Sequence, residues 1–158
     1  MSDIIVREAR VEDVSEIHAL ILELAQFENG LNRVTITPKD LEYDGFGSDP
    51  LFRCLIAEHE GVIKGIAVYF FTYSTWNGKC LYLEDLIVTE KYRASGIGSA
   101  LMERLIALGR DEGVKRMSWQ VLDWNVQAQE FYKKFGSIMD DEWFNGRLDS
   151  DQIQSFKK

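Results

Sequence analysis

The sequence predicts an α/β domain with a mixed β-sheet, antiparallel in its N-terminal part and parallel in its centre, flanked by helices. The chain has 158 residues, of which 46% are hydrophobic and 28% charged, as is typical of one globular core. Three apolar runs follow one another across short turns, which predicts consecutive antiparallel strands. A fourth run follows an amphipathic helix, which predicts a parallel crossover. We therefore expect residues 1–158 to form a single domain.

The first third of the chain contains a short strand and two helices. Residues 4–7 form a β-type run. Apolar residues at three- and four-residue spacing then define one face of a helix: Val14, Ile17, Leu20, Ile21 and Leu24. Asn29-Gly30 ends this helix with a left-handed cap. Thr37 and Pro38 are expected at the N-cap and first position of a second, shorter helix.

The middle of the chain is expected to form three antiparallel strands over residues 52–58, 62–73 and 80–88. Glu60-Gly61 and Asn77-Gly78 lie between them, and both pairs favour the positive φ angles of hairpin turns. These strands form the antiparallel part of the predicted sheet.

The C-terminal third alternates helix and strand. We expect a helix over 97–112, a strand over 114–122, a helix over 126–135, one or two strands within 137–148, and a polar tail over 149–158. An apolar stripe defines the first of these helices: Ile97, Leu101, Leu105 and Leu108. Because this helix connects two strands, the strands should be parallel and the crossover right-handed.

Residues 81–101 are the most informative stretch, because a strand runs into a glycine-bearing turn that opens a helix. Helix N-termini expose unpaired N–H groups and the positive end of the helix dipole, so they bind phosphate-like anions. Gly96 and Gly98 carry no Cβ and leave those amides accessible. Glu84 and Asp85 interrupt the apolar strand upstream. The stretch predicts an anion-binding turn with two carboxylates near it.

Charge and composition exclude several classes of function. The net charge of −8 argues against a nucleic-acid partner and is compatible with a cationic substrate. No apolar run approaches the roughly 20 residues of a membrane span, and the N-terminus has no signal-peptide pattern. Cys54 and Cys80 have neither a disulfide framework nor metal-ligand spacing, which predicts reduced thiols in a cytoplasmic protein without a metal.

The six residues Arg93 to Gly98 read R-A-S-G-I-G, which resembles the R/Q-x-x-G-x-G/A motif of the GNAT N-acetyltransferases. The order of elements around the motif is similar to that family over nearly the whole chain. Further matches resemble the diamine (spermidine/spermine) acetyltransferase group: Lys39-Asp40-Leu41, Asp44-Gly45-Phe46-Gly47, Leu81-Tyr82-Leu83-Glu84-Asp85, Tyr92-Arg93, Gly96-Ile97-Gly98-Ser99 and Trp124-Asn125.

The resemblance implies a GNAT fold and acetyl-CoA as the acetyl donor. In such enzymes the diphosphate binds the turn, here Arg93 and the amides of Ala94, Ser95, Gly96, Ile97, Gly98 and Ser99. The pantetheine arm pairs, like an added strand, with the backbone of Leu86, Ile87 and Val88. The family also places Asn125 against the pantetheine and Tyr132 beside the thioester sulfur.

Acetyl transfer to an amine requires that an ammonium lose a proton and that a thiolate be protonated or held. We expect Glu84 to act as the general base through a water, with burial raising its pKa. Asp85 faces away from Glu84 in a regular strand, so either a bulge brings both to one cleft or one of them lies outside the site. Tyr132 is the candidate general acid, and the transfer is expected to be direct.

By resemblance, Phe27, Glu28, Trp76 and Asp85 contact the amine substrate, and Trp143 closes the site from the C-terminal segment. Polyamine-specific members carry an acidic residue and a proline before this tryptophan, whereas this chain has Ser74-Thr75. That departure resembles the branch that acetylates thialysine and similar amino acids, and it favours a small amine with one terminal ammonium.

Two other functions stay open from the sequence. One is an acetyltransferase for protein amines, and the other is a non-catalytic sensor that binds acyl-CoA. A nucleotide switch is excluded because no G-x-x-x-x-G-K-[ST] motif occurs. The resemblance also implies a homodimer that exchanges its C-terminal strand.

Overall fold

The computed structural model describes residues 3–157. The chain divides into two compact units, one ending at Gln120 and the other beginning at Val121. Among residues 3–157, none of the helices combines the length and the apolar character needed to cross a membrane.

The first unit contains a five-stranded sheet with the order β1-β2-β3-β4-β5. The strands are β1 (Ile4–Glu8), β2 (Arg53–His59), β3 (Val62–Ser74), β4 (Gly78–Val88) and β5 (Met117–Ser118). Neighbours from β1 to β4 are antiparallel, and β5 pairs with β4 in parallel. The predicted mixed sheet is therefore confirmed. The predicted strand over 114–122 is much shorter than expected, because its pairing with β4 covers two residues.

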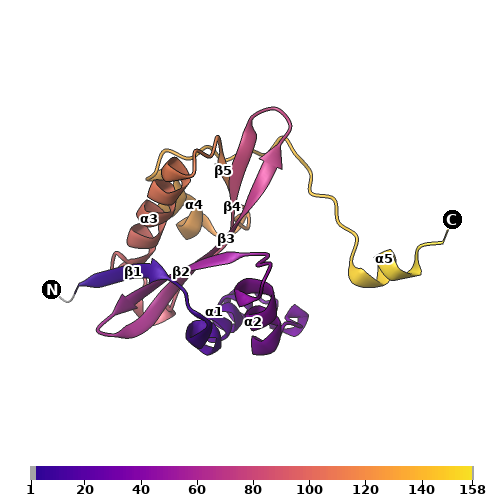
Figure 1. The fold of residues 1–158 in the computed structure, drawn as a ribbon. Coiled ribbons are helices and arrows are strands. Elements are labelled where there is room, and N and C mark those ends of the chain that lie inside the picture. The colour runs from indigo at the N-terminus through magenta and orange to yellow at the C-terminus, as the bar shows by residue number, and fades with distance from the viewer. Residues whose placement is uncertain (1–2, 158) are drawn as a thin grey trace. The chain divides into compact units, whose positions relative to one another are not determined.

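Helices cover both faces of this sheet. Helices α1 (Val14–Phe27) and α2 (Pro38–Phe46) lie on one face, and α3 (Ile97–Asp111) lies on the other (Figure 1). Short 3₁₀ helices span Val11–Asp13, Leu31–Arg33 and Glu90–Tyr92. Thr37 Oγ1 accepts a hydrogen bond from the Asp40 amide, as predicted for an N-cap.

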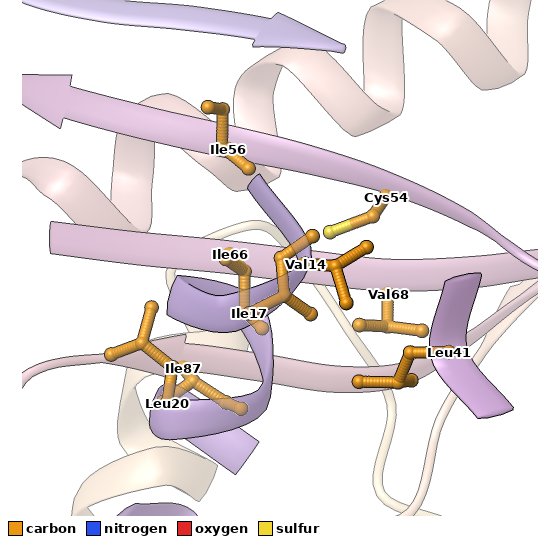
Figure 2. Close-up of a cluster of buried hydrophobic side chains, with 9 residues drawn as sticks. All are labelled: Val14, Ile17, Leu20, Leu41, Cys54, Ile56, Ile66, Val68 and Ile87. Atoms are coloured by element: carbon orange, nitrogen blue, oxygen red, sulfur yellow. The ribbon is translucent and has the colours of Figure 1, made fainter. Parts of the chain in front are cut away.

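The core under α1 is built from the apolar face that the helical spacing predicted. Figure 2 shows side chains from the first two helices meeting those of three strands. All of its members are buried: Val14, Ile17, Leu20, Leu41, Cys54, Ile56, Ile66, Val68 and Ile87. This cluster fixes α1 relative to β3 and β4.

Helix α3 approaches the opposite face of the sheet closely at Gly65 of β3. A Cβ at Gly65 would lie 2.8 Å from Ile97 Cγ2 and 3.1 Å from Leu101 Cδ1. The absence of a side chain at Gly65 therefore lets the first turn of α3 sit against the strands. This contact sets where the N-terminus of α3 lies at the end of β4.

The second unit contains α4 (Val126–Lys133) and α5 (Ser150–Ser155). The strands predicted within 137–148 are wrong: these residues form neither strand nor helix. A strand needs a neighbour for its backbone hydrogen bonds, and this unit offers no other strand among its described residues. Large apolar side chains of its C-terminal part are instead exposed: Ile138, Trp143, Phe144, Leu148, Ile153 and Phe156. The predicted tail includes α5, and its last residue, Lys158, lies outside the described residues.

Candidate active site

A β-bulge in β4 lies at Glu84. Val68 of β3 pairs with Asp85, but the next residue, Tyr69, pairs with Leu83, so Glu84 is an extra residue without a partner in β3. Opposite residues of an antiparallel pair project from the same face of the sheet. Asp85 therefore projects, like Val68, from the face covered by α1 and α2. Of the two arrangements left open by the sequence, the structure has the bulge.

The bulge also brings Tyr82 onto the face of Asp85. Tyr82 pairs with Phe70, two positions along β3 from Val68, and the rings of Tyr82 and Phe70 lie 5.3 Å apart. In a regular strand, residues three positions apart face opposite sides. Burial raises the pKa of the Tyr82 phenol, and the charges of Glu84 and Asp85 raise it further. Sequence reasoning missed Tyr82, because its place depends on the bulge.

Asp85 is the most perturbed carboxylate of this region. Burial raises its pKa from 3.8 to about 6, and the neighbouring charges of Glu84 and Glu28 act in the same direction. Burial also raises the pKa of Glu28, which follows the last residue of α1, while Arg33 acts in the opposite direction. The end of α1 and the bulge of β4 thus form one acidic cluster: Glu28, Glu84 and Asp85.

The expected burial of Glu84 is wrong. Its side chain is exposed, whereas that of Asp85 is partly buried. The bulge explains the difference, because the extra residue is left out of the pairing with β3. Glu84 is therefore in contact with solvent.

The backbone of β4 beyond the bulge has an open edge. β5 pairs with Leu81 and Tyr82 alone, so residues 83–88 have no strand neighbour on that side within the described chain. On their other side, Leu86, Ile87 and Val88 pair with β3. The early end of β5 therefore leaves one edge of these three residues available to a strand-like ligand.

The turn that follows β4 has the backbone expected of an anion-binding loop. Ala94 and Gly96 have left-handed φ angles of 62° and 90°. Ala94, Ser95 and Gly96 are exposed, and Ile97 is buried against the sheet. The first helical hydrogen bond runs from the Ala100 amide to the Gly96 carbonyl, so the preceding amides of α3 have no partner within the helix. These donors fit a diphosphate.

Arg93 joins this turn to the end of α1. Its guanidinium carbon lies 4.7 Å from the centroid of the Phe27 ring, and its Nε donates to the Val88 carbonyl at 3.3 Å. Glu23 of α1 makes a second connection, accepting hydrogen bonds from Thr89 Oγ1 at 2.9 Å and the Glu90 amide at 2.7 Å. Phe27 and Glu28 are thereby held beside the turn and the acidic cluster.

Trp76 is not brought to this cluster within the first unit. It lies at the tip of the β3–β4 hairpin and is 92% exposed. The stretch of β4 from Gly78 to Glu84 corresponds to about 20 Å of extended strand. The hairpin position was predicted correctly, but the chain does not place this indole near the carboxylates.

The other predicted site residues belong to the second unit. Asn125 is the N-cap of α4, where its Oδ1 accepts from the Ala128 amide at 3.2 Å. Tyr132 on α4 is buried and packs edge-to-face on Phe131 at 5.3 Å. Trp143 is 78% exposed. The predicted roles of these three residues stay predictions.

Comparison with known proteins agrees with this architecture. Residues 17–137 match the model of the acetyltransferase (GNAT) family. The chain therefore belongs to the GNAT family and is an acetyltransferase.

Within that family it is 37% identical over 145 residues to the thialysine N-epsilon-acetyltransferase of Sus scrofa, covering 87% of this chain and 85% of that one. It is 41% identical over 140 residues to the spermidine/spermine N(1)-acetyltransferase-like protein 1 of Homo sapiens, covering 84% of this chain and 20% of the relative. An integron cassette protein from the mobile metagenome of V. cholerae shares the fold, with a TM-score of 0.79 and 21% identity over 98% of this chain and 96% of the other.

Proposed function

We propose that this acetyltransferase moves an acetyl group from acetyl-CoA directly to a primary amine of a small molecule, either a diamine or polyamine, or an amino acid like thialysine. The observation that carries the proposal is the acidic cluster of Glu28, Glu84 and Asp85 at the bulge of β4, next to the open strand edge and the glycine turn. Negative groups there attract an ammonium toward the place where a thioester would be held.

The hydrogen-bond donors of the turn and the backbone groups of the strand edge are suited to bind the coenzyme. The amides from Ala94 to Ser99 and the guanidinium of Arg93 would hold the diphosphate. The backbone of Leu86, Ile87 and Val88 would pair with the pantetheine arm, and Asn125 would contact it from the second unit. When bound, acetyl-CoA supplies the activated carbonyl carbon.

The three carboxylates of the acidic cluster have different roles toward the amine. Asp85 and Glu28 hold the ammonium, with Phe27 as an aromatic contact, whereas the Trp76 indole lies too far along the hairpin to share that role in the same chain. Glu84 takes the proton through a water, for which its exposed position is suited. The raised pKa of Asp85, about 6, makes that residue a second proton acceptor within the same cluster.

Tyr132 protonates the departing thiolate. A phenol carries its proton at pH 7, and it can donate that proton to a thiolate. The support for this role is the family resemblance and the side chain's buried position on α4.

The acceptor is a small amine rather than a long polycation. The relative from Sus scrofa is named for thialysine, and Ser74-Thr75 of this chain replaces the acidic residue and proline expected in polyamine-specific members. Without that acidic residue the hairpin tip offers no carboxylate to a second ammonium, which favours a substrate with one terminal ammonium.

We further propose a cytoplasmic homodimer. Cys54 and Cys80 are both free and buried, as expected in a reducing compartment. In the second unit, Trp143, Phe144 and Leu148 expose most of their surface. A second copy of the chain would cover these side chains and give residues 137–148 a strand partner.

An acetyl-transfer assay tests the proposal. Thiol release from acetyl-CoA, corrected for hydrolysis, is measured with thialysine, lysine, spermidine, putrescine and a lysine-containing peptide. We expect turnover with thialysine or another small amine and none with the peptide. Turnover with the peptide alone would show that protein amines are the substrate, and no turnover with any amine would favour a non-catalytic acyl-CoA sensor.

A further inference from the structure

We propose that the ring of Tyr82, together with that of Phe70, forms the surface that holds the carbon chain of the amine substrate. This inference rests on the proposed function, because it takes the acidic cluster as the place where the ammonium binds. Tyr82 is thereby a residue that determines which amine is accepted, and it takes no part in moving the acetyl group or a proton.

The bulge in β4 places Tyr82 beside the acidic cluster. Its partner Phe70 and the partner of Asp85, Val68, lie two positions apart on β3, so Tyr82 and Asp85 project from the same face of the sheet. Such neighbours are about 7 Å apart along a strand, so a short carbon chain reaches from one to the other. Burial raises the pKa of the Tyr82 phenol, and the charges of Glu84 and Asp85 raise it further, as expected of a ring within electrostatic reach of both carboxylates.

The rings of Tyr82 and Phe70 form one aromatic surface. Their centroids lie 5.3 Å apart, and their planes are inclined by 35°. Both side chains are partly exposed, whereas Val68, the preceding residue of β3 on this face, is buried in the core under α1. Aromatic rings contact alkyl chains through their apolar faces and attract cations through their π electrons. The pair therefore offers an amine a suitable surface where the core under α1 ends.

The direction of the amine follows from the surroundings of the bulge. The turn and the strand edge proposed for the coenzyme both lie on the C-terminal side of the bulge, within residues 86–99. On the sheet face covered by α1, the inward direction is filled by the core, where Ile66 and Ile87 are buried (Figure 2). The carbon chain of an amine bound at the cluster therefore extends toward Tyr82 and Phe70.

A homologous series of amines tests this role. We measure kcat/KM for lysine, ornithine and 2,4-diaminobutyrate, whose side chains differ by one methylene from one to the next, or for cadaverine, putrescine and 1,3-diaminopropane if the assay accepts diamines. Burying a methylene against an apolar surface strengthens binding by about 4-fold when it is complete and by less at a partly open surface. For the natural chain we therefore expect kcat/KM to fall about 10-fold from the longest to the shortest amine.

Variants of Tyr82 show whether the ring carries this dependence. Tyr82→Ser removes the ring, so the fall should shrink to about 2-fold while the CoA affinity, which reports that the fold is kept, stays unchanged. Tyr82→Gln replaces it if the serine variant does not fold. Tyr82→Phe keeps the ring and should keep the natural dependence. Calorimetric dissociation constants of the same amines for the CoA-bound chain should follow the same pattern.

Tyr73→Ser is the matched control. Tyr73 lies three positions from Phe70 in a regular stretch of β3, so it projects from the opposite face of the same hairpin, and it is 77% exposed. This variant also removes a tyrosine ring from the hairpin, and it should leave the dependence on chain length unchanged.

The outcomes distinguish this inference from the function on which it rests. If Tyr82→Ser binds CoA and keeps the natural dependence on chain length, or if the natural chain shows no such dependence, the role of Tyr82 is wrong while the enzyme activity stands. Loss of the dependence in Tyr82→Phe would also contradict it, because the ring is still present. If the natural chain acetylates no amine, the proposed function itself fails.

Discussion

The two units of the chain differ in how they use their apolar side chains. In residues 3–120, many apolar residues of the predicted helices and strands are buried against one another, as Ile17, Ile56 and Leu101 show. In residues 121–157, Trp143, Phe144 and other large apolar side chains are exposed. The first unit therefore contains a buried core of its own, and the second exposes apolar surface, which is the kind of surface that partners cover.

The contrast separates the parts of the proposed enzyme that lie in the first unit from those that lie in the second. The first unit contains the turn, the open strand edge and the acidic cluster, which together are suited to bind both substrates. The second unit contains the proposed acid, Tyr132, and exposes the surface that we propose a second copy covers. Binding should therefore depend mainly on the first unit, with Asn125 as the second unit's proposed contact to the coenzyme, and turnover should depend on both units.

The largest expected effect tests whether the second unit takes part in catalysis. Tyr132→Phe should lower kcat by about 10²-fold or more, the usual scale for a positioned general acid, with little change in CoA affinity. Steady-state kinetics and calorimetry measure the two quantities. Tyr73→Phe, at an exposed tyrosine of the hairpin, is the control and should leave kcat unchanged. An unchanged kcat in Tyr132→Phe would remove Tyr132 from the mechanism.

The next effect concerns the stability of the first unit. The pKa of Asp85 is about 6 in the folded chain against an ordinary value of 3.8, so the folded state binds the proton more tightly. Stability therefore falls as the pH rises from about 4 to about 6, and above this window the charged, partly buried carboxylate costs about 3 kcal/mol. Asp85→Asn removes that cost and should be more stable than the natural chain at pH 8 by about this amount, but not at pH 4.

Urea unfolding at pH 4 and pH 8 measures this difference. Asp13→Asn is a control for which the opposite change in stability is expected. The Arg7 guanidinium holds the pKa of Asp13 below its usual range, so the charged form of Asp13 stabilises the fold at neutral pH. Asp13→Asn should therefore destabilise the chain at pH 8. If Asp85→Asn and the natural chain have the same free energy of unfolding at pH 4 and at pH 8, the charged form of Asp85 does not destabilise the fold.

A matched pair of glycines tests the turn. Gly96 and Gly113 both have left-handed φ angles, 90° and 69°, at opposite ends of α3. Alanine at either position should cost about 1 kcal/mol of stability, because L-residues disfavour this conformation. Only Gly96→Ala should weaken CoA binding, by about 10-fold, since it alone displaces the amides of the turn. Equal CoA affinity in both variants would place the diphosphate elsewhere.

The smallest expected effect concerns the exposed surface of the second unit. Trp143→Ser should raise the dissociation constant of the proposed dimer by about 5-fold, as loss of an aromatic contact at an interface commonly does. Sedimentation velocity over a concentration series measures it, with Tyr43→Ser, an exposed aromatic residue of α2, as the control. A chain that is monomeric at every concentration would leave these side chains without the proposed partner.

Local chemistry made much of the fold predictable. Thr37 and Pro38 start α2, and Glu60-Gly61 forms the first hairpin turn, both as expected. Each of these signals acts within a few residues. The motif from Arg93 to Gly98 likewise predicted the turn before α3.

Features that depend on register were not predictable. The bulge at Glu84 is visible only once the pairing of β3 with β4 is known, and it decides that Asp85 and Tyr82 share a face. The apolar pattern of residues 137–148 led to a wrong strand prediction. A strand also needs a pairing partner, and its own sequence cannot supply one.

The central claim is that the turn from Arg93 to Ser99 and the adjoining edge of β4 bind the acetyl donor. Calorimetric titration of the folded natural chain with acetyl-CoA tests it most directly. We expect saturable heat with one site per chain, and weaker binding in Gly96→Ala but not in Gly113→Ala. A folded chain that takes up no acetyl-CoA would contradict this claim.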